Sequence, residues 1–132
     1  MLSREYNVAV KDYRDLMVWQ KSMMLAKQVY LCSTNFPKHE IYGLSSQIRR
    51  SAVSVASNIA EGHGRETPKE FARFLRITRG SLSELQTQLY LSNDLGYCNT
   101  AEFNDLIMAS EEIGRMLRGL QNTLDSQLSA LD

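Results

Sequence analysis

Glu61 and His63 are the two side chains whose types best suit acid–base chemistry. They lie in the segment NIAEGHGR, residues 58 to 65, which also holds two glycines. An imidazole can exchange a proton near neutral pH, but residues two positions apart on a helix do not share a face. The metalloprotease pattern H-E-x-x-H and the hydrolase pattern G-x-S-x-G are both missing. The segment therefore favours a structural or solvated loop histidine, and we expect no enzymatic activity.

The two glycines of this segment fit the end of a helix better than a phosphate-binding loop. The pattern G-x-x-x-x-G-K-[ST] is missing, and Pro68 lacks an amide that such a loop would use. Gly62 and Gly64 can instead supply the left-handed residue on which helices commonly end. Thr67 would cap the next helix, with Pro68 at its first position and Glu70 completing a capping box. The segment predicts a helix end, a short turn and a helix start.

A stripe of basic side chains is the stronger functional signal. Its first-rank members fall on one side of a predicted helix: Lys69, Arg73, Arg76 and Arg79. An antiparallel neighbouring helix and the intervening loop would add the second-rank candidates Arg49, Arg50 and Arg65. Such a strip suits the phosphates of RNA or DNA. A solvated helix face paired with nearby glutamates is the alternative, and no aromatic side chains interleave with the basic ones.

The charges of the chain cancel in sum but are unevenly distributed. There are 15 basic and 15 acidic residues, so the net charge alone predicts no partner. Residues 45 to 80 hold seven basic and three acidic residues, whereas residues 81 to 132 hold two and eight. This asymmetry indicates either a surface for a polyanion or two surfaces that attract each other in an assembly.

Length and composition indicate one globular domain spanning residues 1–132. A chain of 132 residues buries about two thirds of its unfolded surface, and its 43% hydrophobic and 23% charged composition is ordinary for a soluble protein. No secretory leader or membrane-spanning run occurs, which predicts a cytoplasmic protein. Cys32 and Cys98 fit no metal or redox spacing. We expect no metal and no cofactor, and leave open whether the two cysteines pair.

Apolar residues recur at intervals of three and four along four long stretches. This helical period predicts helices at about residues 15–35, 44–61, 68–95 and 100–128, with Asp15 as the cap of the first. Short connectors at 36–43, 62–67 and 96–99 imply antiparallel neighbours, and so an all-α, up-down-up-down four-helix bundle. Gly80 falls within the third helix, where it costs about 1 kcal/mol relative to alanine. We expect another helix, of this bundle or of a second subunit, to approach its backbone.

The first predicted helix is apolar on two nearly opposite faces. One stripe consists of Leu16, Trp19, Met23, Ala26 and Tyr30, and the other of Val18, Leu25, Val29 and Cys32. Since only one stripe can face the core of a single bundle, the other needs a different cover. A second subunit is the simplest one, which predicts an oligomer interface that includes Val18, Leu25 and Val29.

Several short motifs along the chain occur together in one known family. They are DL (15–16), VWQK (18–21), FP (36–37), YGL (42–44), SQIRRSA (46–52), SNIAEG (57–62), GR (64–65), EF (70–71), FL (74–75), RGS (79–81), EL (84–85), TQL (87–89) and LGY (95–97). With these motifs the chain resembles the small four-helix-bundle proteins encoded within intervening sequences of bacterial 23S ribosomal RNA genes. That family is similar in turn to Avd, the accessory variability determinant of diversity-generating retroelements.

The resemblance covers about residues 12 to 128. It implies a ring-like homo-oligomer, a pentamer of bundles, with a basic surface that engages nucleic acid and no catalytic residues. A reverse transcriptase is the implied partner if the chain is encoded in a retroelement. We therefore predict a non-enzymatic oligomeric bundle that binds RNA or DNA through the basic strip. The alternative is a protein-interaction or scaffold module, whose strip meets an acidic protein partner or a neighbouring subunit.

Overall fold

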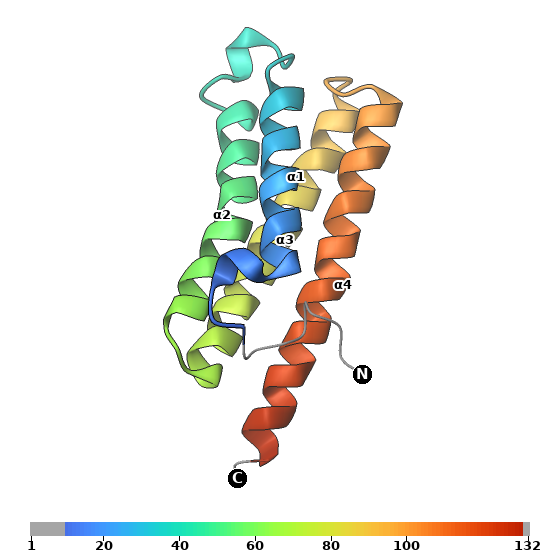
Figure 1. The fold of residues 1–132 in the computed structure, drawn as a ribbon. Coiled ribbons are helices and arrows are strands. Elements are labelled where there is room, and N and C mark those ends of the chain that lie inside the picture. Colours follow the sequence, from blue (N-terminus) through green and yellow to red (C-terminus); the bar gives the residue numbers. More distant parts are fainter. Residues whose placement is uncertain (1–9, 131–132) are drawn as a thin grey trace.

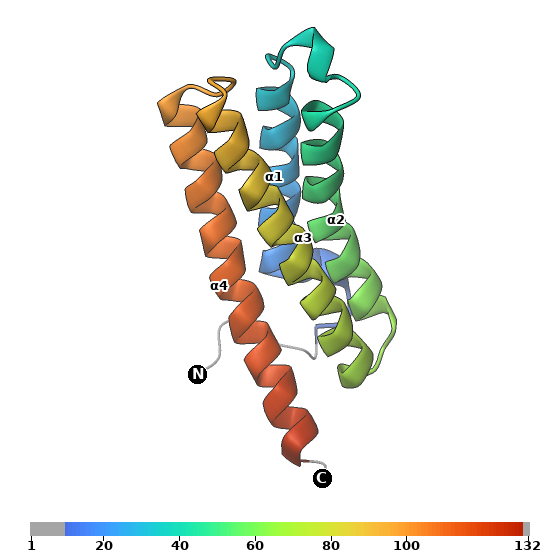
Figure 2. The same cartoon turned by 180° about the vertical axis from the view of Figure 1, so that it is seen from behind.

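Four long helices form a bundle in the computed structural model, which describes residues 10–130 (Figure 1). Helix α1 spans Met17–Ser33, α2 spans Leu44–Gly64, α3 spans Pro68–Asp94 and α4 spans Thr100–Ala130. Each helix packs against the next along the chain, and α4 returns against α1. Consecutive helices run in opposite directions, and the end of α4 extends beyond the α2–α3 turn (Figures 1 and 2). The predicted all-α four-helix bundle is confirmed.

The start of α1 differs from the prediction. A short 3-10 turn, η2 (Tyr13–Asp15), precedes the helix, and the Asp12 carboxylate caps this turn by accepting a hydrogen bond from the Arg14 amide at 2.9 Å. Asp15 lies inside the turn, so its assignment as the helix cap is wrong. The extended residue before α1 is Leu16, which is fully buried and has no capping side chain. Burial of an apolar side chain, rather than a polar cap, positions the start of this helix.

The turn between α2 and α3 also corrects the prediction. Helix α2 continues through both glycines to Gly64, and the one left-handed residue of the turn is Glu66, with φ of 67°. Gly62 is buried, and a Cβ placed on it would lie only 2.4 Å from the Phe74 Cβ of α3. The missing side chain therefore allows α2 and α3 to approach closely. Gly62 acts in packing rather than in ending the helix.

The predicted start of α3 is confirmed in part. The Thr67 hydroxyl accepts a hydrogen bond from the Glu70 amide at 3.2 Å, and Pro68 is the first helical residue. The Glu70 carboxylate does not complete the capping box. It instead accepts two hydrogen bonds from the Arg73 guanidinium, because a charged donor on the next turn of α3 binds a carboxylate more strongly than a backbone amide does.

The core contains the stripe of α1 that was predicted to face another subunit. Val18, Leu25 and Val29 have at most 2% of their surface exposed and pack among the buried residues of the other three helices. Their assignment to an oligomer interface is therefore wrong. The opposite stripe is only partly covered, since Met23 and Tyr30 are 47% and 45% exposed. None of the helices within residues 10–130 has the length and apolar character needed to cross a membrane.

Candidate functional site

The seven predicted basic residues separate into three places on the bundle. Arg49 lies on α2 toward α1, where its Nε donates a hydrogen bond to the Ser33 hydroxyl at 2.7 Å. Its guanidinium also lies 4.9 Å from the centre of the Tyr30 ring. These contacts join α1 to α2, so Arg49 has a structural role within the chain. Arg50, its neighbour, is exposed on α2.

A second group surrounds the Phe74 ring near the α2–α3 turn. The guanidiniums of Arg65 and Arg73 lie 5.2 Å and 4.6 Å from the centre of this ring. Each is also paired with a carboxylate, Arg65 with Glu61 at 3.0 Å and Arg73 with Glu70 at 2.9 Å. The hydrogen bonds from Arg73 lower the pKa of Glu70. Much of the positive charge at this end is thus compensated, although Lys69 is exposed beside it.

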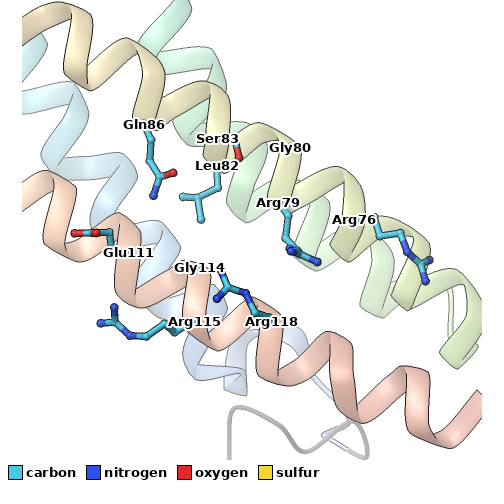
Figure 3. A pocket seen from close by; sticks show the side chains of 10 residues that line it. All are labelled: Arg76, Arg79, Gly80, Leu82, Ser83, Gln86, Glu111, Gly114, Arg115 and Arg118. Atoms are coloured by element: carbon cyan, nitrogen blue, oxygen red, sulfur yellow. The ribbon is translucent and has the colours of Figure 1, made fainter.

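The third group lines a groove between α3 and α4 (Figure 3). Arg76 and Arg79 come from α3, and α4 contributes Arg115 and Arg118, which the sequence analysis did not single out. The groove has a volume of about 640 Å³, and its remaining lining residues are Gly80, Leu82, Ser83, Gln86, Glu111 and Gly114. We call it the arginine groove. It brings together two first-rank members of the predicted strip and leaves out Lys69 and Arg73.

The arginines of this groove are poorly neutralised. Arg76 contacts the Asp125 carboxylate of α4 at 3.4 Å. Among the carboxylates of residues 10–130, none lies within 4 Å of the charged nitrogens of Arg79, Arg115 or Arg118. In Figure 3 the Arg79 and Arg118 side chains extend into the space between the two helices. Several unpaired guanidiniums at one place form a site of positive potential for an anion.

Gly80 leaves the groove open beside Arg79. A Cβ placed on Gly80 would meet no atom within 4 Å, so no other helix of residues 10–130 packs against this side of its backbone. The expectation of a close helix of this bundle at Gly80 is therefore wrong. Helices α3 and α4 come closer at Gly114 of α4, where an added Cβ would lie 3.4 Å from the Leu82 side chain of α3. The absent side chain gives a ligand access to the backbone of α3.

One sequence signal could have identified the second wall of the groove. Arg115 and Arg118 are the only basic residues after residue 80, and their spacing of three places them on one face of a helix. This pair is the only positive charge in an otherwise acidic segment, and it could have been singled out for that reason. The sequence alone does not place the pair in a groove, because the groove forms only where α3 and α4 pack together.

Glu61 and His63, the two candidates for acid–base chemistry, show no catalytic arrangement. His63 Nε2 donates a hydrogen bond to the Val10 carbonyl, and its ring meets the Phe71 ring edge to face at 5.5 Å. Glu61 pairs with Arg65 instead of with the histidine. Within residues 10–130, histidine, cysteine and acidic side chains form no group of three suited to a metal ion. The contacts of His63 are those of a packed structural residue.

Comparisons with known proteins agree with this architecture. Residues 14–119 match the family described as 23S rRNA-intervening sequence protein. The chain is also similar to a crystal structure from Bacteroides thetaiotaomicron, described as a protein of unknown function from the S23 ribosomal protein family. That similarity has a TM-score of 0.69 at 25% sequence identity and covers 76% of this chain and 94% of the other. A search among curated proteins finds no match.

Proposed function

Because the chain belongs to the 23S rRNA-intervening sequence protein family, we propose that it is a non-enzymatic protein that binds RNA or DNA. The observation that carries this proposal is the arginine groove, in which Arg79, Arg115 and Arg118 have no carboxylate partner among the described residues. Lys69, which is exposed on α3, would extend the contact along the phosphate backbone, and Arg73 would join it by exchanging its Glu70 partner for a phosphate. Each phosphate that they neutralise releases counterions, so the affinity should fall as salt rises.

Two other anion-binding arrangements fit less well. A catalytic site for phosphate chemistry would need a general base or a metal centre near the arginines, and Glu111 is the only titratable acid that lines the groove. A small inorganic anion would need a close cage of donors, whereas the groove is open along its length (Figure 3). A polyanion that contacts several guanidiniums in succession uses this geometry best.

The test is a titration of a structured RNA at two salt concentrations. We expect Arg79→Gln/Arg118→Gln to reduce the affinity at low salt by about tenfold or more, since a hydrogen bond to a charged group contributes roughly 1.5–3 kcal/mol. The slope of log affinity against log salt should become shallower by about one for each lost phosphate contact. The matched control is Lys27→Gln/Lys38→Gln, which removes the same charge from exposed sites outside the groove. Equal affinities for both double variants and the wild type would refute the proposal.

A second candidate function is a scaffold, favoured by the acidic surface of α4. Asp105, Glu111 and Glu112 line a pocket beside the exposed Met108 on this helix, together with Arg115, and Glu112 is paired with Lys21 of α1 at 2.9 Å. In a ring-like homo-oligomer, which the resemblance implies to be a pentamer, the arginine groove of one subunit could meet this acidic surface of the next. Arginine substitutions would then change the assembly mass rather than RNA affinity. An acidic protein partner would bind the groove in the same way, and a reverse transcriptase would be a partner if the chain is encoded in a retroelement.

A further inference from the structure

The two ends of the arginine groove differ in chemistry. Two polar contacts mark the register of α3 against α4, Arg76 with Asp125 at 3.4 Å and Gln86 with Ser110 at 3.1 Å. In this antiparallel register Arg79 lies opposite Arg118, whereas Gln86 lies opposite Glu111, about two helical turns or roughly 10 Å further along. Arg76, Arg79 and Arg118 line one end of the groove, whereas Gln86 and Glu111 line the other, where Arg115 lies one helical turn from Glu111 (Figure 3).

The amide of Gln86 is held in one orientation. The Ser110 hydroxyl is buried and donates its proton to the Ile107 carbonyl at 2.7 Å, so its oxygen can only accept a further hydrogen bond. Gln86 must then present its Nε2 to the Ser110 oxygen, which lies 3.1 Å away. Its Oε1 and one remaining N–H stay available. Gln86 thus offers an acceptor and a donor side by side, the pair that reads the edge of a nucleobase.

Glu111 limits what can lie at the Gln86 end. Its carboxylate lines the groove there and offsets the charge of Arg115 one turn away, so this end attracts a phosphate less than the Arg79 end does. The carboxylate can accept hydrogen bonds from an amino group or from a ribose hydroxyl. The ligand should therefore carry a phosphate at one end and an uncharged hydrogen-bonding group at the other. The groove volume of about 640 Å³ lies within the range of roughly 300–1,000 Å³ that is typical of small-molecule sites.

We propose that the arginine groove holds one unpaired nucleotide of a bound strand, with its phosphate between Arg79 and Arg118 and its base edge on Gln86. This inference rests on the proposed function and adds a preference for single strands. Bases of a duplex are paired and stacked, so their edges cannot enter a groove between two helices, whereas unpaired bases can be turned outward. The guanidinium planes of the groove can also stack on such a base, which supplies the stacking surface that aromatic residues would otherwise provide.

The experiment compares a short unstructured RNA strand with the same strand annealed to its complement, by fluorescence anisotropy. We expect the wild type to bind the single strand about tenfold more tightly than the duplex, equivalent to about 1.4 kcal/mol. Gln86→Ala should lower the affinity for the single strand about fivefold to tenfold without changing the salt slope, because the phosphate contacts remain. The duplex affinity should not change. Gln127→Ala, on an exposed part of α4 outside the groove, is the matched control.

A second variant tests the groove without removing a hydrogen bond. Gly80→Leu adds a side chain at an exposed helical position with no atom within 4 Å of its Cβ, so the fold should persist while the groove is filled. We expect Gly80→Leu to abolish the preference for the single strand over the duplex, although the substitution does not change the charge of the protein. Equal binding of strand and duplex by the wild type, or a Gln86→Ala variant that binds like the wild type, would overturn this inference alone. Absence of binding to either probe would overturn the proposed function as well.

Discussion

Glu40 is the residue through which the first connector is joined to the start of α2 and to the α3–α4 connector at the same end of the bundle (Figure 1). Its Oε1 accepts a hydrogen bond from the Leu44 amide at 3.1 Å, and its Oε2 accepts one from the Tyr97 hydroxyl at 2.8 Å. The Leu44 amide is one of the donors at the start of α2 that have no partner within the helix. Glu40 therefore caps α2 from four residues upstream, in place of the Gly43 that precedes the helix.

These two hydrogen bonds make the stability of the fold depend on pH. The Leu44 amide first, and then the Tyr97 hydroxyl, lower the pKa of Glu40 below its ordinary value of 4.5. A carboxyl whose pKa is lower in the folded state stabilises the fold above its unfolded pKa, and this contribution is lost as the pH falls through the folded value. Tyr97→Phe removes one of the two donors. We expect it to lower the urea midpoint near neutral pH and to reduce the loss of stability below about pH 4.5.

The measurement is a series of urea unfolding curves from neutral to acidic pH. Tyr42→Phe is the matched control, because the Tyr42 side chain is 94% exposed and makes no hydrogen bond to a described residue that this change would remove. The difference in urea midpoint between Tyr97→Phe and the wild type should therefore shrink as the pH falls. A difference that is the same at every pH would show that the hydroxyl does not act on the Glu40 carboxyl.

At the scale of the helices, two glycines of similar appearance in the sequence have opposite roles. Gly62 faces α3 at a distance that excludes a side chain, whereas Gly80 faces open space in the arginine groove. Gly62→Ala should lower the free energy of unfolding by about 1–3 kcal/mol, the usual cost of overpacking. Gly80→Ala, its matched control, should raise it by up to about 1 kcal/mol, because alanine is the better helix former. Urea unfolding of both variants checks the prediction, and a stable Gly62→Ala variant would contradict the close packing of α2 on α3.

The sequence predicted the helices well because their apolar periodicity is long and regular. Helix α3 begins at Pro68 as predicted, since Thr67 and Pro68 together are a strong local start signal. The end of α2 was missed because a glycine can end a helix or allow another helix to come close, and only the position of Phe74 decides between them. Likewise, the sequence shows two apolar stripes on α1 but does not say which one faces inward.

The sequence predicted the α3 side of the arginine groove but not the α4 side, for a related reason. The basic stripe on α3 follows from spacing within one helix, and Arg76 and Arg79 do line the groove. Arg115 and Arg118 are about 40 residues further along the chain, and they join the groove only through the pairing of α3 with α4. Arg49 was misplaced because its neighbours Ser33 and Tyr30 belong to α1, whose contact with α2 no local pattern specifies.

On the whole molecule, the surface shared by α1 and α4 is the best candidate for contact between subunits. Leu31 on α1 and Met108 on α4 are 63% and 65% exposed, and Asp105 lines the shallow pockets beside both. Single exposed apolar residues are ordinary, but exposed apolar residues on two neighbouring helices, beside one shared acidic residue, make this surface a candidate for contact. This surface replaces the Val18 stripe as the predicted interface of the proposed homo-oligomer.

Two double variants separate this interface from the scaffold alternative. A monomer has a mass of 15.0 kDa, so light scattering readily distinguishes it from a ring. Leu31→Glu/Met108→Glu introduces two charges at the surface shared by α1 and α4, and we expect it to reduce the assembly to monomers. The control is Ile41→Glu, at an exposed position in the first connector, which should leave the mass of the assembly unchanged. If the groove binds nucleic acid, Arg79→Gln/Arg118→Gln keeps the wild-type mass and loses RNA affinity. If the groove instead meets the acidic surface of a neighbouring subunit, Arg79→Gln/Arg118→Gln lowers the mass of the assembly. The unpaired guanidiniums would then attract the neighbouring subunit, and without them the ring would dissociate.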